Sequence, residues 1–478
     1  MTRPLYNKNG ALPLGTKLLF GVGTIAYGIK ENGFSALLLL YYNQVVGLPA
    51  AQVGLAIMCA LIVDAILDPI VGYTSDNFRS RLGRRHPFMY AAALPAGLLY
   101  MLLWTPPEAL GTSGTLIYLI MVSVAIRAII SCYEIPSAAL VPELSRNYHE
   151  RTSILGFRTI FGWLGGTLML LVTFGVLLRP TELYPVGQLN PEGYRHYGMI
   201  ASILIIVAIL TSTLGTHRYI PLLRKPDART EKGEPIWASL KVALSNKAFL
   251  ILLGAGACMY TVQGLNFALS TYFNTYLWEF SARTIALYTA IIILGAFVAF
   301  TLARTISARI GKKQAARIAI LLSTSFSVTP LLLRYGGLFP GNDSPALLPL
   351  VMGFTLATVS FGVCATLLVA SMMSDVVEYE QERSGKRTEG TFFAGNFFIQ
   401  KCVTGIGLFL SGAILAIAAF PDEAVPGEVS FDVLGTMILV FSGINVTFGL
   451  LAAFVVGHFP ISQTDHEERL VRLSASAE

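Results

Sequence analysis

The sequence predicts an all-α membrane protein with twelve transmembrane helices in two pseudo-symmetric six-helix bundles. Of the 478 residues, 54% are hydrophobic and only 13% are charged, whereas soluble domains usually have about 25% charged residues. The mean hydropathy is +0.63. Long apolar stretches, alternating charges in the loops, and a motif that occurs once in each half together predict this fold.

Twelve apolar stretches reach the ~20 residues that a helix needs to cross the hydrocarbon core of a bilayer. The first six are expected at residues 16–46, 52–76, 87–106, 114–141, 153–178 and 197–219. The second six are expected at residues 247–278, 284–307, 315–335, 346–374, 392–420 and 431–458. We therefore expect an N-terminal bundle in residues 1–219, a linker in 220–246, a C-terminal bundle in 247–460 and a tail in 461–478.

The loops alternate in charge. Basic residues gather after the second, fourth, sixth, eighth and tenth spans, and the loop after the second span alone has Arg79, Arg81, Arg84 and Arg85. The opposite loops carry only isolated charges. Cytoplasmic loops are enriched in Lys and Arg, so we expect both termini to be cytoplasmic.

A short motif indicates an internal repeat. The sequence RLGRR (residues 81–85) follows the second span, and RIGKK (residues 309–313) follows the eighth. Two related six-helix halves are typical of major facilitator transporters, in which substrate binds between the halves near the midplane. We expect ion pairs of a cytoplasmic gate from the loop residues Asp76, Arg84, Arg85, Arg309, Lys312, Lys313 and Asp375.

Charged side chains inside the predicted spans are the main functional candidates, because each costs at least ~2.5 kcal/mol at the bilayer centre. Asp64 and Asp68 are four residues apart and share one helix face. Two carboxylates that lie so close share either a proton or a bound cation. The remaining candidates are Lys30, Glu31, Arg127, Ser131, Glu134, Arg158 and Lys401.

Each candidate also has a structural interpretation. Asp64 and Asp68 could pair with Arg158 or Lys401 only to hold helices together. Buried arginines such as Arg127 and Arg158 often serve as counter-ions, and Lys401 could balance charge in the same way. Lys30 and Glu31 could extend to the membrane surface if the first span is shifted.

Other classes of protein find little support. The five cysteines form no CxxC pair, which argues against a zinc site. The sequence has no HExxH, P-loop or GxSxG motif. We therefore expect no enzyme, no cofactor and no nucleic-acid partner, and we expect a monomer to suffice.

Several of these segments together resemble one family. DAILDPIVG (64–72), DNFRSRLGRRHPF (76–88), YEIP (133–136), GFR (156–158), SDVVEYEQERSGKRTEG (374–390) and IQK (399–401) occur in order along the chain. They resemble motifs of the glycoside–pentoside–hexuronide:cation symporters, the melibiose-permease group of the major facilitator superfamily. This resemblance implies a sugar–cation symporter that works by alternating access.

The resemblance also implies roles for individual residues. Asp64, Asp68 and Ser131 would hold the coupling ion, and Glu31, Glu134 and Arg158 would contact the substrate, with Lys401 near both sites. Charge complementarity adds Lys30 and Arg127 as ligands for an anionic substrate such as a hexuronide. The coupling ion is expected to be H⁺ rather than Na⁺, which would also bind at Asp64 and Asp68.

Three positions depart from the family pattern. Sodium users have Asn directly before the second acid of the second span, where this chain has Leu67. Leu67 offers no oxygen to a cation, which favours H⁺. Ala138 and Glu134 stand where the melibiose type has an aromatic residue and Asp, so a galactoside is not the expected substrate. The alternative function is a carrier of lysolipids or amphipathic compounds, including proton-coupled export.

Overall fold

The computed structural model describes residues 12–145, 148–223, 245–384 and 389–460, and its regular elements in these ranges are helices. Ten of the described helices are long and apolar enough to cross a membrane. Their bounds are α4 Ala50–Asn77, α5 His86–Leu103, α6 Gly111–Leu144, α7 Tyr148–Val172, α8 Pro191–His217, α10 Lys247–Tyr272, α11 Ala282–Tyr335, α12 Leu347–Ser384, α13 Glu389–Ile417 and α14 Phe431–Gly457.

The predicted first span is a series of short helical segments. They are α1 (Leu14–Val22), α2 (Thr24–Asn32), η1 (Gly33–Leu37), α3 (Leu38–Leu40) and η2 (Tyr41–Val45). Wider π-helical turns form η1 and η2, and such turns often occur at functional sites. The segment as a whole covers the predicted range 16–46.

Helix α11 contains the predicted spans 284–307 and 315–335. Its 54 residues are interrupted at Gly311, where φ is +77°. This left-handed backbone conformation is accessible to glycine and breaks the helix direction. The exact count of twelve spans stays a prediction. Most of the predicted linker and the whole predicted tail lie outside the described residues.

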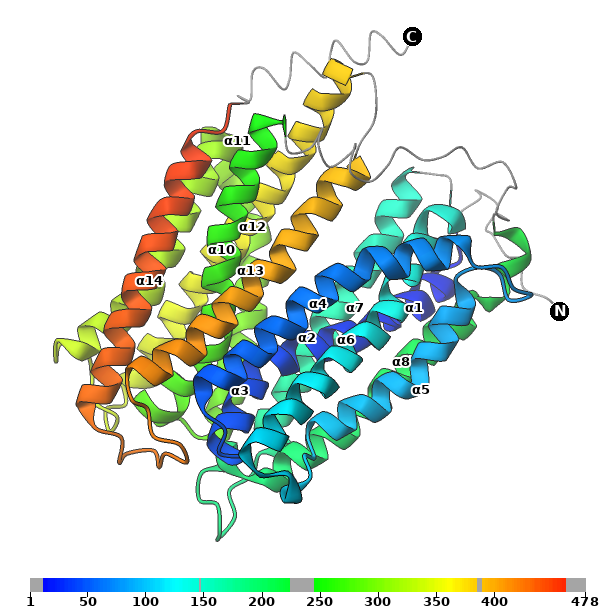
Figure 1. The fold of residues 1–478 in the computed structure, drawn as a ribbon. Coiled ribbons are helices and arrows are strands. Elements are labelled where there is room, and N and C mark those ends of the chain that lie inside the picture. The colour runs from blue at the N-terminus through cyan, green and yellow to red at the C-terminus, as the bar shows by residue number, and fades with distance from the viewer. Residues whose placement is uncertain (1–11, 146–147, 224–244, 385–388, 461–478) are drawn as a thin grey trace.

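The helices of the first half and those of the second half lie in two neighbouring groups (Figure 1). Helix α4 packs against α13, and α7 packs against α11. Near η2, hydrogen bonds join the groups directly: Tyr276 donates to Gln44 Oε1 at 2.9 Å, and Asn43 donates to Asp422 Oδ1 at 2.9 Å. The two groups are therefore tied together at the end where η2 lies.

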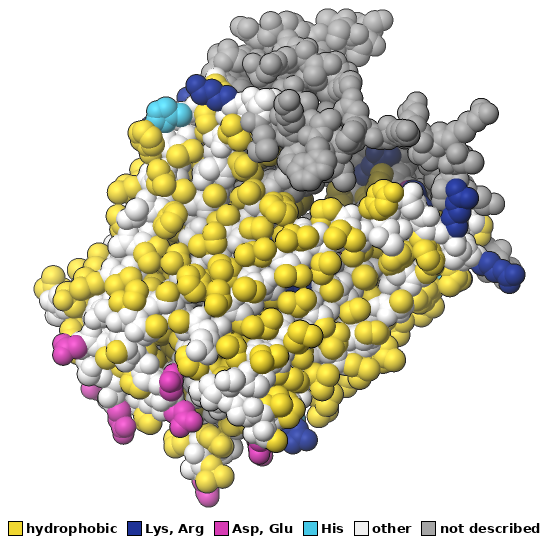
Figure 2. All heavy atoms as spheres, viewed as in Figure 1, with side chains coloured by type: hydrophobic (Ala, Val, Ile, Leu, Met, Phe, Trp, Pro, Cys, Tyr) yellow, Lys and Arg dark blue, Asp and Glu magenta, His cyan; other side chains and the backbone are white. Residues whose placement is uncertain are grey.

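The surface is that of an integral membrane protein. A broad hydrophobic face covers the middle of the molecule, and most charged side chains lie at its two ends (Figure 2). Large apolar side chains on this surface are well exposed, for example Ile117 (62%), Met121 (66%) and Phe297 (61%). Exposed apolar area of this extent marks contact with a partner or a membrane.

Candidate functional site

A network of charged side chains is buried where α2, α4, α6 and α13 meet. We call it the charged network, and its members are Lys30, Glu31, Asp64, Asp68, Arg127, Ser131 and Lys401. Asp64 and Lys30 are 0% exposed, and Arg127 is 1% exposed. Groups that are so deeply buried are tolerated only when they are paired.

The centre of the network is the aspartate–lysine cluster of Asp64, Asp68, Ser131 and Lys401. Ser131 Oγ lies 2.8 Å from Asp64 Oδ1 and 2.7 Å from Asp68 Oδ1. Lys401 Nζ lies 3.1 Å from Asp64 Oδ2 and 2.5 Å from Asp68 Oδ2. Since Lys401 belongs to α13, this cluster links the first half of the chain to the second.

The cluster has room for one proton between its acids. A serine hydroxyl carries a single hydrogen, so Ser131 can donate to only one of the two carboxylates at a time. A proton taken up by the other carboxyl would turn its contact with Ser131 into a second hydrogen bond. The pair can therefore accept one proton without a change of geometry, at the expense of part of its ionic contact with Lys401.

The rest of the network surrounds Asp64 with positive charge. Arg127 Nη1 lies 3.2 Å from Asp64 Oδ2 and 3.4 Å from Glu31 Oε1. Lys30 Nζ lies 2.7 Å from Glu31 Oε1. The guanidinium of Arg127 also packs over the ring of Phe34, 4.5 Å from its centroid, which is a cation–π contact.

Two predicted site residues lie outside this network. Glu134 is on α6, three residues after Ser131, and its Oε2 is buried without a hydrogen-bond partner in the described part of the chain. Arg158 Nη1 lies 2.5 Å from Ser137 Oγ, and the guanidinium packs over Phe20. Arg127, and not Arg158, is the arginine that pairs with Asp64.

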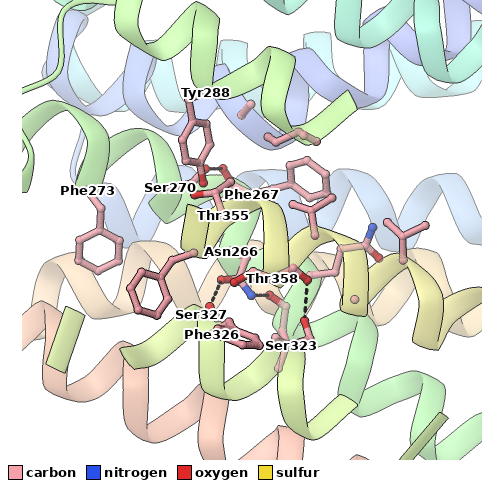
Figure 3. Close-up of a pocket in the computed structure, with 18 of the residues that line it drawn as sticks. Asn266, Phe267, Ser270, Phe273, Tyr288, Ser323, Phe326, Ser327, Thr355 and Thr358 are labelled. Carbon is pink, nitrogen blue, oxygen red and sulfur yellow. Dashed lines mark hydrogen bonds between the residues drawn. The ribbon is translucent and has the colours of Figure 1, made fainter. Parts of the chain in front are cut away.

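A second feature is a cavity of about 350 Å³ lined by residues of α10, α11, α12 and α14 (Figure 3). We call it the amide cavity, because Gln263, Asn266 and Asn274 line it together with several hydroxyl groups. Asn32 of α2 and Trp163 of α7 also line it, so both halves of the chain contribute. None of the described residues that line it is Asp, Glu, Lys, Arg or His.

The amide cavity was not predicted from the sequence, because nearly all the predicted site residues are charged and none of them lines this cavity. A usable signal was present in α10 and the π-helical turn η7 (Phe273–Leu277) that follows it, where Gln263, Asn266, Ser270 and Asn274 recur every three or four residues. That spacing places them on one helix face, and all four line the cavity.

The two repeated motifs share a glycine conformation and an ion pair. Gly83 and Gly311 both have positive φ, at +78° and +77°. The basic residue after each glycine pairs with an acid of a later helix: Arg84 with Glu143 at 2.6 Å, and Lys312 with Asp375 at 2.7 Å. Asp375 was predicted because it lies in the segment 374–390 that resembles a family motif, whereas Glu143 lies in no such segment and was missed.

The predicted gate residues form pairs within each half. Arg85 contacts Asp76 at 2.9 Å and Glu143 at 2.7 Å. Lys313 Nζ donates to the Phe459 carbonyl at 3.2 Å, and Arg309 is exposed. These described pairs do not cross between the two halves, so a gate that joins the halves stays a prediction.

Comparisons with known proteins show the family of the chain. A family model described as MFS/sugar transport protein matches residues 19–463. The chain is 27% identical to an uncharacterised symporter of Synechocystis, over 96% of each chain. It is 23% identical to the isoprimeverose transporter of Lactiplantibacillus pentosus, over 86% of this chain and 81% of that one.

Two further comparisons extend this result. The sodium-dependent lysophosphatidylcholine symporter 1 of Xenopus tropicalis is 24% identical, over 97% of this chain and 91% of that one. The crystal structure of a D-xylose–proton symporter superposes with a TM-score of 0.69 at 14% identity, covering 94% of this chain and 98% of that chain. At that identity the likeness shows the fold alone. The chain therefore belongs to the MFS/sugar transport family, as its resemblance to the glycoside–pentoside–hexuronide:cation symporters implied, and it is a membrane transporter and not an enzyme.

Proposed function

We propose that this protein is a proton-coupled symporter that imports a sugar or glycoside by alternating access between two six-helix bundles. The observation that carries the proposal is the aspartate–lysine cluster, which is largely buried, can accept one proton, and joins α4 and α6 to α13. Sodium fits less well, because Lys401 Nζ occupies the position between the two Oδ2 atoms and Leu67 offers no oxygen ligand.

The cluster gives a physical route to coupling. When one of the two carboxyls takes a proton, Lys401 loses part of the negative charge that holds it. The contact between α13 and the first half then weakens, because a buried ion pair is stable only while its partners balance. Protonation at this site would therefore change the free energy difference between the inward- and outward-facing arrangements of the halves.

The remaining charged residues are proposed as substrate ligands. Glu134 is the strongest of these, since its buried Oε2 has no hydrogen-bond partner among the described residues. Glu31, Lys30, Arg127 and Lys401 already pair with one another or with the aspartates, so a ligand would have to compete for them. Arg158 would act from the next helix, α7.

The experiment is uptake of labelled glycosides, pentosides and hexuronides by proteoliposomes. It is run with a pH gradient, with a sodium gradient and with neither, for the wild type and for Asp68→Asn. A pH gradient alone should drive accumulation by the wild type, and the variant should lose accumulation while retaining exchange. Asp343→Asn, in an exposed loop, is the matched control. Full active uptake by Asp68→Asn would rule out the coupling role of the cluster.

A second candidate is a carrier for lysolipids or amphipathic compounds, including a proton-coupled exporter. The observation that favours it is the similarity, over nearly the whole chain, to a lysophosphatidylcholine symporter. This function predicts lysolipid transport that is insensitive to Glu134→Gln, whereas sugar import predicts a loss of uptake in that variant.

We place the protein in a bacterial inner membrane with both termini cytoplasmic and propose that a monomer completes the cycle.

A further inference from the structure

We propose that the amide cavity binds an uncharged, polyhydroxylated ring, so that the carrier selects neutral sugars or glycosides over hexuronides and lysolipids. This inference rests on the proposed function as a carrier and names its substrate class. It adds neutral polar groups of the second half of the chain to the charged substrate ligands proposed above.

The first argument is the hydrogen-bonding chemistry of the cavity wall. Ser327 donates to Asn266 Oδ1 at 3.2 Å, and Asn266 Nδ2 lies 3.2 Å from Asn445 Oδ1. Asn445 is fully buried and donates in turn to the Phe441 carbonyl at 3.0 Å. Asn445 therefore fixes the orientation of the Asn266 amide on the wall of the cavity.

Other neutral polar groups surround this amide. Figure 3 shows Asn266, Ser327, Ser323 and Thr358 on one side of the cavity and Tyr288 with Thr355 on another. Gln263 lines the same cavity and is exposed. Amides and hydroxyls can each donate and accept, which matches the several hydroxyl groups of a sugar ring.

The second argument is the absence of a counter-charge. No Asp, Glu, Lys, Arg or His is among the described residues that line the cavity. A carboxylate or phosphate placed there would be desolvated without a cationic partner, which is strongly unfavourable. The nearby cations Lys30 and Arg127 are already paired with Glu31 and Asp64.

The third argument is size and shape. The volume of about 350 Å³ lies within the ~300–1,000 Å³ range of small-molecule sites, which is enough for a small glycoside. Aromatic rings of Phe267, Phe326, Trp163 and Trp278 line the cavity and offer apolar faces to the C–H groups of a sugar.

The position of the cavity agrees with a transport site. Asn32 and Trp163 of the first half line it together with four helices of the second half. Thr271 of α10, which also lines it, donates to the Ala36 carbonyl of η1 at 2.9 Å. A ligand in the cavity would therefore contact both halves, and a movement of one half against the other would change its enclosure.

The test is calorimetric binding to the purified protein without any ion gradient. The probes are matched pairs, methyl glucoside with methyl glucuronide and methyl galactoside with methyl galacturonide, together with lysophosphatidylcholine. The inference predicts that at least one neutral glycoside binds, that its uronide binds at least tenfold more weakly, and that the lysolipid does not compete. Equal or tighter binding of the uronide, competition by the lysolipid, or no binding of either glycoside would overturn it.

Variants locate the site. Asn266→Ala and Gln263→Ala should each weaken binding of the neutral glycoside at least tenfold, and Ser327→Ala should weaken it several-fold. Ser325→Ala is the matched control, because Ser325 is on the same helix, is exposed and does not line the cavity. Gln263→Ala also covers the case in which Asn266→Ala fails to fold. Unchanged binding in well-folded Gln263→Ala and Ser327→Ala would overturn the inference.

The binding assay separates this inference from the proposed coupling. If a neutral glycoside binds with the predicted pattern but neither gradient drives its accumulation, the substrate class stands and the symport mechanism fails. If a pH gradient drives accumulation of a hexuronide that binds tightly, the symport mechanism stands and this inference fails.

Discussion

Lys401 is the residue on which the charge balance of the site depends. Its amine contacts both Asp64 and Asp68, and it is the member of the aspartate–lysine cluster that comes from the second half of the chain. Charge inside the predicted spans, together with the four-residue spacing of the two aspartates, predicted Lys401, Asp64 and Asp68 as site residues. Arg158 or Lys401 was the partner expected for the two aspartates. The structure pairs Asp64 with Lys401 and with Arg127 in place of Arg158, because α6 packs against α4.

Replacing Lys401 by Met should destabilise the protein by about 3–5 kcal/mol, the cost of leaving buried charges unpaired. The double variant Lys401→Met with Asp68→Asn removes both charges and should recover much of that stability. Denaturation in detergent measures both effects. Equal destabilisation in the single and double variants would show that the two groups do not interact.

Ser131→Ala should lower concentrative uptake, since the hydroxyl that bridges the two carboxyls is lost. The free energy of unfolding should fall by about 1–3 kcal/mol, the penalty for an unsatisfied buried group. The matched control is Ser123→Ala on the same helix, because Ser123 Oγ is buried and has no hydrogen-bond partner among the described residues. The two variants would behave alike only if Ser131 had no special role.

At the scale of elements, close contact between α2 and α7 places the charged network. The two backbones can approach because neither helix has a side chain at the contact, which is formed by Gly28, Gly162 and Gly166. A Cβ added at Gly28 would lie 1.8 Å from the Gly162 carbonyl oxygen. This contact brings Lys30 and Glu31 of α2 beside α4 and α6. The spacing of small residues favours such packing, although the partner helix is evident only in the structure.

Gly28→Ala should therefore separate α2 from α7 and destabilise the fold by about 1–3 kcal/mol, the usual cost of overpacking. Gly156→Ala on α7 is the control, because a Cβ at that position meets nothing within 4 Å. Thermal melting of the two purified variants tests the contact. A melting temperature for Gly28→Ala equal to that of Gly156→Ala would contradict the close packing.

The whole molecule shows how far sequence and structure agree. Hydrophobic length predicted the helical segments, since a segment that crosses lipid must satisfy its backbone polar groups internally. Charge inside the spans predicted the charged network. The amide cavity was missed because neutral residues such as Asn266 cost little in a bundle and give no strong sequence signal. The hydrogen bonds that tie the two halves together at one end were missed because they join residues more than 200 positions apart in the sequence.

The hydrogen bonds at the end where η2 lies lead to a prediction about conformational change. Gln44 contacts Tyr276, the Pro421 carbonyl and the Ala424 amide across the two halves. Gln44→Ala removes these bonds and should shift the population toward arrangements that are open at this end. Spin labels at Leu183 and Val425, both exposed, should then show longer or broader distances. An unchanged distance distribution would show that other contacts hold this end closed.

The central claim is that the aspartate–lysine cluster couples protons to substrate. The most direct test is a pH-sensitive dye trapped inside proteoliposomes that contain the wild type or Asp68→Asn, with no gradient imposed and no sodium present. Addition of a transported glycoside should acidify the lumen with the wild type, because each substrate molecule enters with a proton, and should leave the pH unchanged with the variant. Glycoside entry that requires sodium and leaves the lumen pH unchanged in the wild type would contradict the claim.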